Sequence, residues 1–366
     1  MSEQALLYLL ALQKVSGLGD KSIQKMVKHV GSPQAVFESS VKQLVQVPGI
    51  NKNILANINN KEHLALAQKE LELIEKHNIK TTTWLEESYP EKLKLIPDHP
   101  CLLSYKGNID PQPNRIISIV GTRKITSYGK GFLTNFFKEI AAYNPIIVSG
   151  LAYGVDGFAH QLALDHNLIT YGVLAHGLYR IYPPAHTTLA NNMVENNGCI
   201  MTESHFHAKP DRENFPKRNR IIAGLSNVTL VIESDVKGGS MITARLANDY
   251  NRDVMAVPGN VTSKQSSGCN FLIKNNEAHM LAEPDDLIKL MNWESTTSAP
   301  KQTQLFVDLT KQEQQIIDLF SNGSTISIDQ IAMHLNWPTS QVSLELLGLE
   351  MKGVITSLPG ARYKLA

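Results

Sequence analysis

The feature that most restricts the fold of this chain is a series of short apolar runs, rich in β-branched residues, between residues 116 and 257. Amphipathic stretches typical of helices lie between several of them, at 131–142, 155–166 and 240–251. Runs that are apolar on both faces and alternate with helices predict an α/β fold with a doubly wound, mostly parallel sheet. The predicted strands are IISIV (116–120), IIVS (146–149), ITYGVL (169–174), CIMTE (199–203), VTLVIE (228–233) and DVMAV (253–257).

Glycine-containing turns follow three of these predicted strands. Ligands of doubly wound sheets bind at the carboxyl ends of the strands, and glycine lets the backbone approach a phosphate there. Arg123 adds a planar guanidinium suited to phosphate oxygens. None of the turns has the GxGxxG spacing of a dinucleotide site, and an ordinary βα turn is the alternative. The candidate phosphate-binding residues are Gly121, Thr122 and Arg123, then Ser149, Gly150 and Gly154, and finally Gly239, Ser240 and Thr243.

The second of these turns leads into a predicted helix whose first turn contains Asp156. A carboxylate at that position favours the helix dipole, which explains its presence without a ligand. Two adjacent phosphate-type turns on one sheet edge favour an extended anionic ligand over a single nucleotide.

The strongest electrostatic signal is the segment from Lys209 to Arg220, KPDRENFPKRNR, in a chain whose net charge is only +1. Pro216 fits the start of a helix that presents Lys217, Arg218, Asn219 and Arg220. Phe215 beside them offers a surface for base stacking, a combination expected of a protein that binds single strands. The alternative is a solvated basic face with Phe215 turned into the core.

Composition changes along the 366 residues indicate several domains. Residues 1–80 predict a helical domain with two glycine turns of helix-hairpin-helix type, 15–22 and 47–53. Turns of this kind hold DNA phosphates or simply connect short helices. The remaining predicted parts are an α/β core at 81–292, a polar linker at 293–304 and a winged helix at 305–366, with a hairpin around Pro359-Gly360.

The third helix of the predicted winged helix, 340–352, carries two glutamates and one lysine. A helix that reads duplex DNA is normally basic, so a role in protein docking or in structure is at least as well supported. A transcription factor that acts through this helix is correspondingly disfavoured.

The widely spaced cysteines Cys101, Cys199 and Cys269 match no zinc, redox or disulfide pattern, which predicts a reducing cytoplasm. No run approaches the roughly 20 apolar residues that span a bilayer, so no membrane association is expected. Several histidines fall between residues 160 and 207, but none forms an HExxH or zinc-finger pattern. We therefore predict neither a metal nor another cofactor.

Taken together, the motifs resemble the DNA-processing protein A (DprA/Smf) family. The matching segments are GTR (121–123), SGLAYGVD (149–156), YPPAH (182–186), FPKRNRIIAGLS (215–226), GGSMITA (238–244), VPG (257–259) and GCNFLI (268–273). The flanking segments agree with the family's layout of an N-terminal helical, SAM-like domain, a Rossmann-like core and a C-terminal winged helix. Two departures from the family pattern are His176 and Gly239, which affect the expected shape of the pocket.

The resemblance implies a non-enzymatic protein that binds single-stranded DNA, protects incoming strands during natural transformation and loads the RecA recombinase onto them, usually as a homodimer. It also implies that Arg123 and the cluster from Lys217 to Arg220 line the groove for the strand. The competing hypothesis is a Rossmann-like nucleotide phosphoribohydrolase of the LOG type. Such an enzyme needs a glutamate soon after its glycine turn, where this chain has Arg245 and no acid in the first turns of the helix.

Overall fold

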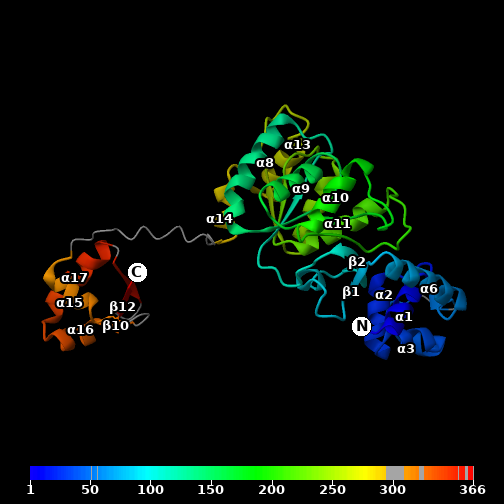
Figure 1. Cartoon of the computed structure of the whole chain (residues 1–366), viewed down its shortest axis with the longest axis horizontal. Helices are drawn as coiled ribbons and strands as arrows, with labels where there is room; N and C mark the ends of the chain where they lie inside the picture. Colours follow the sequence, from blue (N-terminus) through cyan, green and yellow to red (C-terminus); the bar gives the residue numbers. More distant parts are fainter. Residues whose placement is uncertain are drawn as a thin grey trace. The chain divides into compact units, whose positions relative to one another are not determined.

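The chain forms two compact units in the computed structural model, Met1–Thr297 and Ser298–Ala366 (Figure 1). The structure describes residues 1–50, 52–55, 57–293, 309–320, 325–352, 354–358 and 362–365. The predicted linker at 293–304 lies, apart from Trp293, outside the described residues, as does the predicted turn at Pro359-Gly360.

Within the described part of the first unit, nine strands form one sheet in the order β1-β2-β6-β5-β4-β3-β7-β8-β9. The strands from β3 to β9 pair in parallel, whereas β1 and β2 are added antiparallel beyond β6. The strands are β1 (Lys80–Thr83), β2 (Leu102–Gly107), β3 (Ile116–Val120), β4 (Ile146–Ser149), β5 (Thr170–Val173), β6 (Cys199–Thr202), β7 (Val228–Val231), β8 (Asp253–Ala256) and β9 (His279–Met280). The predicted doubly wound, mostly parallel sheet is thus confirmed.

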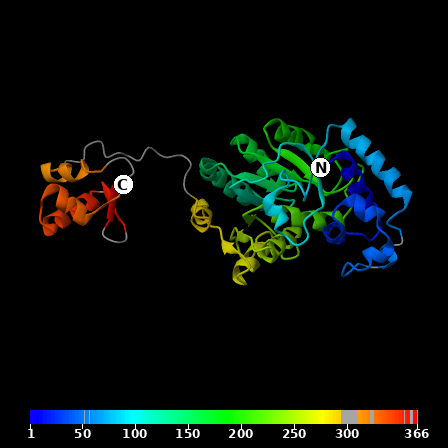
Figure 2. The ribbon, with the colours of Figure 1, turned by 90° about the horizontal axis from the view of Figure 1, so that it is seen from below.

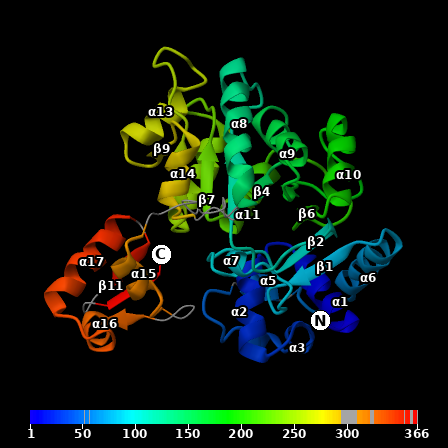
Figure 3. The same ribbon diagram turned by 60° about the vertical axis from the view of Figure 1, so that its left-hand side comes forward.

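Helices cover both faces of this sheet, and β3 shows how its sequence allows that. Ile116 and Val120 pack with the helices of one face, whereas Ile117 and Ile119 pack with those of the other. Figure 3 shows α8, α9 and α14 on one side of the sheet. These are α8 (Ser127–Ile140), α9 (Val155–Asp165) and α14 (Pro284–Leu290), and the opposite face is covered by α7 (Glu91–Lys94), α11 (Asn214–Leu225), α12 (Gly239–Asp249) and α13 (Ser267–Lys274).

The N-terminal helices share a hydrophobic core with one end of the sheet (Figure 2). Leu9 and Ile23 belong to the same apolar cluster as Leu174 and Phe206 of the α/β core and Met193 of α10 (Thr187–Glu195). Phe206 is tied further by its N–H, which donates to Glu70 at 2.5 Å, and by the His77 ring stacked at 4.7 Å. The helices are α1 (Glu3–Gln13), α2 (Asp20–Val30), α3 (Pro33–Glu38), α4 (Val41–Leu44), α5 (Lys52–Leu55) and α6 (Lys61–Lys76).

The second unit has the three predicted helices, α15 (Lys311–Ile317), α16 (Ile328–Leu335) and α17 (Thr339–Met351). Its core contains Ile316, Ile331 and Leu346, one from each helix. The predicted hairpin strands pair as β11 (Ile355–Leu358) and β12 (Arg362–Leu365), and β12 also pairs with a short strand that was not predicted, β10 (Ile326–Ser327). The winged-helix prediction is confirmed.

Candidate nucleic-acid interface

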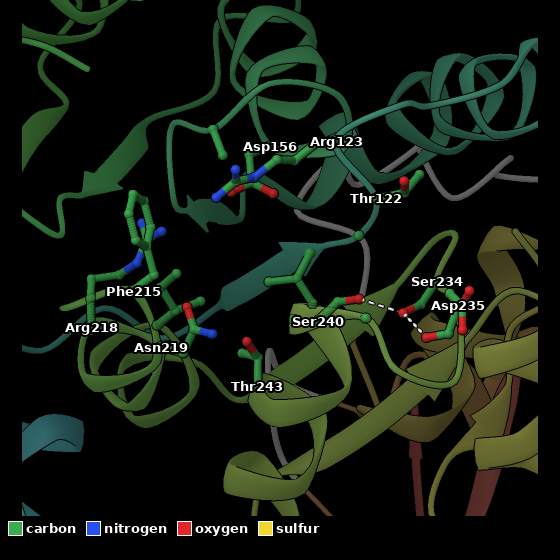
Figure 4. Close-up of a pocket in the computed structure, with 16 residues that line it drawn as sticks. Thr122, Arg123, Asp156, Phe215, Arg218, Asn219, Ser234, Asp235, Ser240 and Thr243 are labelled. Carbon is green, nitrogen blue, oxygen red and sulfur yellow. Dashed lines mark hydrogen bonds between the residues drawn. The ribbon is translucent and has the colours of Figure 1, made fainter. Parts of the chain in front are cut away.

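The main candidate site is a pocket at the point where the strand order of the sheet reverses. The chain passes from β3 through β4, β5 and β6 on one side and then returns to β7 on the other side of β3. Loops after β3 and β7 diverge there, and α11 and α12 close the sides, leaving a cavity of about 320 Å³ (Figure 4). We call this cavity the switch-point pocket; doubly wound sheets bind their ligands at this place. Its polar lining residues are Thr122, Arg123, Asp156, Arg218, Asn219, Ser234, Asp235, Ser240 and Thr243.

The turn after β3 is held so that Arg123 stays available. Gly121 packs so closely on Val155 that an added Cβ would lie 2.6 Å from a methyl carbon of that side chain. The Thr122 N–H donates to the Glu233 carbonyl at 2.7 Å, and the Glu233 carboxylate accepts from the backbone and hydroxyl of Thr126 at the start of α8. Arg123 itself is exposed. The turn is therefore a fixed support for a solvent-facing cation.

Arg123 and Phe215 lie together at the pocket, although 91 residues lie between them in the sequence. The guanidinium carbon lies 5.3 Å from the centre of the half-buried Phe215 ring, within the range of a cation–π contact. Phe215 belongs to the first turn of α11, which begins at Asn214, two residues before the predicted start. The pair combines a phosphate-binding cation with an aromatic surface.

The turn after β4 supports the pocket from behind. Ser149 is fully buried, and its hydroxyl donates to the Ile119 carbonyl at 2.6 Å. Gly154 has a φ of +80°, and a Cβ there would collide with the Thr122 carbonyl. The Gly150 N–H donates to the Asp156 carboxylate at 3.1 Å. Sequence reasoning assigned Asp156 only a helix-dipole role, whereas this carboxylate also closes the turn and lines the pocket.

The turn after β7 contributes polar groups that are largely engaged with one another (Figure 4). Ser240 donates to the Ser234 hydroxyl at 2.7 Å, and Ser234 donates to the Asp235 carbonyl at 2.8 Å. Gly239, in contrast, faces open space, with no heavy atom within 4 Å of a Cβ built on it. Ser234 and Asp235 were missed in the sequence; their position directly after the predicted strand 228–233 was the available signal.

Arg218 lies in the wall of the pocket and not on the surface. The residue is 5% exposed. Its Nη1 donates to the Val173 carbonyl, and its guanidinium packs on Gly150. Burial lowers the pKa of Arg218 to about 10, so it stays charged at neutral pH. Burial also raises the pKa of Asp156, and the charge of Arg218 opposes that rise. Arg218 is therefore a buried charge in the pocket wall and not a free surface cation.

Arg220 points away from the switch-point pocket and joins α11 to the N-terminal helices. Its Nη2 contacts the Glu203 carboxylate and lies 3.6 Å from that of Asp20, the first residue of α2. Burial raises the pKa of Glu203 to about 7 in spite of this cation. The ion cluster borders a second cavity of about 500 Å³, which Lys217, Lys21 and Asp98 also line.

The structure thus divides the predicted site residues among the switch-point pocket, the second cavity and the turn after β4. Lys217 is exposed and lines the second cavity with Arg220, whereas Ser149, Gly150 and Gly154 form the support of the β4 turn. Arg218 borders both cavities. The predicted residues that the structure brings together around the switch-point pocket are Gly121, Thr122, Arg123, Phe215, Arg218, Asn219, Gly239, Ser240 and Thr243.

No group of three or more His, Cys, Asp or Glu side chains in the described part of the chain is arranged to hold a metal ion. Among the same residues, no helix has the length and apolar character needed to cross a bilayer.

The architecture defines a class: a Rossmann-like core with a pocket at its switch point, preceded by helix-hairpin-helix elements and followed by a winged helix. Residues 80–292 match the sequence profile of DNA recombination-mediator protein A, and residues 299–361 match that of the DprA winged helix domain. Residues 9–58 match a SAM-like helix-hairpin-helix tandem. The chain belongs to the DprA/Smf family.

Individual relatives agree with this assignment. Protein Smf of Escherichia coli strain K12 is 33% identical over 285 residues, which cover 76% of this chain and 75% of the relative. The crystal structure of DprA from Streptococcus pneumoniae is similar with a TM-score of 0.68 and 29% identity, over 79% of this chain and 99% of that one. The structure of DprA from Helicobacter pylori, reported for its single-stranded DNA binding mode, gives 0.53 and 28%, over 59% and 97%.

Proposed function

We propose that this chain binds single-stranded DNA at the switch-point pocket. The observation that carries the proposal is the pairing of Arg123 with Phe215 at that pocket, at 5.3 Å. A strand presents phosphates to the cation and an unpaired base to the ring, which is the combination that single-strand binding requires. Membership in the DprA/Smf family and the single-strand binding of the H. pylori relative support it.

The arrangement favours affinity without sequence preference. Arg123 and the backbone of the glycine turns contact phosphates, which all nucleotides share. Stacking on Phe215 accepts any base because every base has a π-face. Duplex DNA keeps its bases paired and stacked, so it gains the phosphate contacts but not the stacking.

A fluorescence anisotropy titration tests this function. Full-length protein is titrated into mixed-sequence single-stranded and duplex oligonucleotides of equal length across a salt series. We expect tighter binding of the single strand and an affinity that falls linearly on a logarithmic salt scale. Equal affinity for both forms, or binding that ignores salt, would contradict the proposal.

We propose further that the protein is not an enzyme. The carboxylates at the pocket are engaged: Asp156 accepts from the Gly150 N–H, and Asp235 accepts from the Lys237 N–H at 3.0 Å. Arg245 occupies the helix after the glycine turn and lies 3.7 Å from Glu277 in an ion pair. A hydrolase of the LOG type would need a free acid there. Release of base from nucleoside monophosphates, in proportion to protein and lost in Arg123→Ala, would favour the enzyme instead.

The finer role that we propose is the one the family resemblance implies: the protein protects incoming strands during natural transformation and loads RecA onto them, as a homodimer in the cytoplasm. Cys101, Cys199 and Cys269 are all buried and free, as suits a reducing compartment. RecA filament formation on strands covered with single-strand-binding protein should accelerate when this protein is added. Sedimentation equilibrium measures the subunit number, and a monomer at micromolar concentration would contradict the dimer.

A further inference from the structure

A groove on the other side of the Gly154 turn has no role in the site described so far. It lies between α8, α9 and α10 and has a volume of about 460 Å³. Its wall includes Lys130 of α8, Phe158 of α9 and Asn192 of α10, together with Ala185 and His186 from the YPPAH segment at 182–186. We call it the α8–α10 groove.

The α8–α10 groove adjoins the switch-point pocket through the backbone. Gly154 lines the groove and packs directly on the Thr122 carbonyl, and the next residue, Val155, donates its N–H to that carbonyl at 3.1 Å. Thr122 and Arg123 line the switch-point pocket. Tyr153, which is 49% exposed, meets the His186 ring edge-on at 5.3 Å on the same border. A bound strand that leaves Arg123 toward Gly154 therefore enters the α8–α10 groove.

The groove repeats the chemistry of the pocket. The Lys130 ammonium lies 5.9 Å from the centre of the half-buried Phe158 ring, as Arg123 lies over Phe215. Exposed Thr188 and Asn192 add hydrogen-bonding groups along α10. Among the described residues, no ion pair includes Lys130, and no carboxylate is among the residues that line the groove. A polyanion therefore meets a cation and an aromatic ring without opposing charge.

The second cavity, which Lys217 and Arg220 line, is less suited to a polyanion than the α8–α10 groove. It is lined by the carboxylates of Asp20, Asp98 and Glu203 as well as by its cations. Phosphates near those carboxylates would be repelled, and Arg220 is already paired. Between the two directions, the charges favour the α8–α10 groove.

We propose that the α8–α10 groove is an extension of the strand-binding site, in which Lys130 contacts a phosphate and Phe158 supports a base of the same single strand. This inference rests on the proposed function and specifies where the strand continues. It assigns the YPPAH segment a place in the site, as the border between the pocket and the groove.

The test compares oligonucleotide lengths in the full-length protein. Mixed-sequence strands of about 4 and about 16 nucleotides, which bracket the site sizes of many single-strand binders, are titrated across a salt series. The variants are Lys130→Ala and, as the matched control, Lys138→Ala, which removes the same charge from an exposed position near the end of the same helix.

We expect Lys130→Ala to weaken binding of the longer strand about threefold and to lower its salt slope by about 0.7, since one phosphate contact is lost. Binding of the shorter strand should not change, and Lys138→Ala should resemble the wild type for both lengths. If Lys130→Ala resembles Lys138→Ala on the longer strand while the wild type binds both lengths, the extension is wrong and the pocket stands. If the wild type binds neither length, the proposed function itself fails and the extension with it.

Discussion

The arginines beside the start and in the middle of α11 have opposite roles. At its start, Phe215 meets the exposed Arg123 across an open pocket. About one and a half turns of helix further along, Arg220 forms ion pairs with Glu203 and Asp20. The sequence shows one basic segment at 209–220, whereas in the structure Lys217 of that segment is exposed and Arg220 is committed to the fold. Formal charge in a sequence therefore overstates the charge that a ligand meets.

The largest effect is expected from the removal of Arg220, which tests whether this side chain is structural. Arg220→Ala leaves Glu203 and Asp20 without their shared cation in a largely buried position, and we expect a loss of about 3 kcal/mol in unfolding free energy at pH 8. Chemical denaturation measures it. Arg212→Ala, an exposed change in the same segment, serves as the control and should cost less than about 0.5 kcal/mol. Equal stabilities of the two variants would show that Arg220 is not structural.

The pH dependence of stability sharpens the same point. Because burial raises the pKa of Glu203 to about 7 from its ordinary value of 4.5, the folded state holds its proton more tightly than the unfolded state does. The contribution of this group is therefore greatest below about pH 4.5 and is lost as the pH rises to about 7, by about 3 kcal/mol. Glu203→Gln should remove this component from denaturation curves measured between pH 5 and pH 8. An unchanged pH profile would mean that Glu203 ionises normally.

At the start of α11, Phe215→Ala tests stacking. We expect a loss of about 1–3 kcal/mol in binding of single-stranded DNA, with an unchanged salt slope because no cation is removed. Phe215→Tyr keeps a ring and should retain most of the affinity. A Phe215→Ala variant that binds normally would place the stacked base elsewhere.

The exposed cations should give smaller effects with the opposite signature. Arg123→Ala should remove one phosphate contact for strands of every length, which lowers the salt slope by about 0.7 and the affinity about threefold. Lys217 lines the second cavity, whose carboxylates repel phosphates, so Lys217→Ala should change the salt slope and the affinity less than Arg123→Ala does. A folded double variant with wild-type affinity at every salt concentration would show that the strand binds outside both cavities.

The smallest expected effect is that of Gly239→Ala. Gly239 has open space around its missing side chain and an ordinary helix-start position in α12. The unfolding free energy, measured by thermal unfolding, should fall by less than about 0.5 kcal/mol. Gly154→Ala, at a residue with a φ of +80° whose added Cβ would collide with backbone, should lower it several times more. Equal costs would mean that the turn after β7 is tighter than it looks.

The parallel strands β3 to β8 were predictable because each carries its own signal, whereas the short parallel strand β9, with two exposed residues, was missed. A buried run such as IISIV is apolar at every position, and the observed β3 covers the same residues, 116–120. The strands β1 and β2 were missed because KTTT and LLSYKG bury only part of their side chains, so their sequences resemble loops. Their pairing also depends on β6, far along the chain.

Contacts between distant residues set a similar limit at the site. The glycine turns and Arg123 were predictable from position, since they directly follow apolar strands. The pairing of Arg220 was not, because its partners are Asp20 of α2 and Glu203, which directly follows β6. Nothing local to the segment from Lys209 to Arg220 distinguishes a paired arginine from a free one.

The core shared by the N-terminal helices and the sheet also has a consequence for synthesis of the protein. The ribosome completes α6 at Lys76 long before it makes Leu174 and Phe206, on which these helices pack. At about 5–20 residues per second, the nascent helices wait on the order of ten seconds with that apolar face uncovered. During this interval the uncovered apolar face of the N-terminal helices is accessible to chaperones and prone to aggregation.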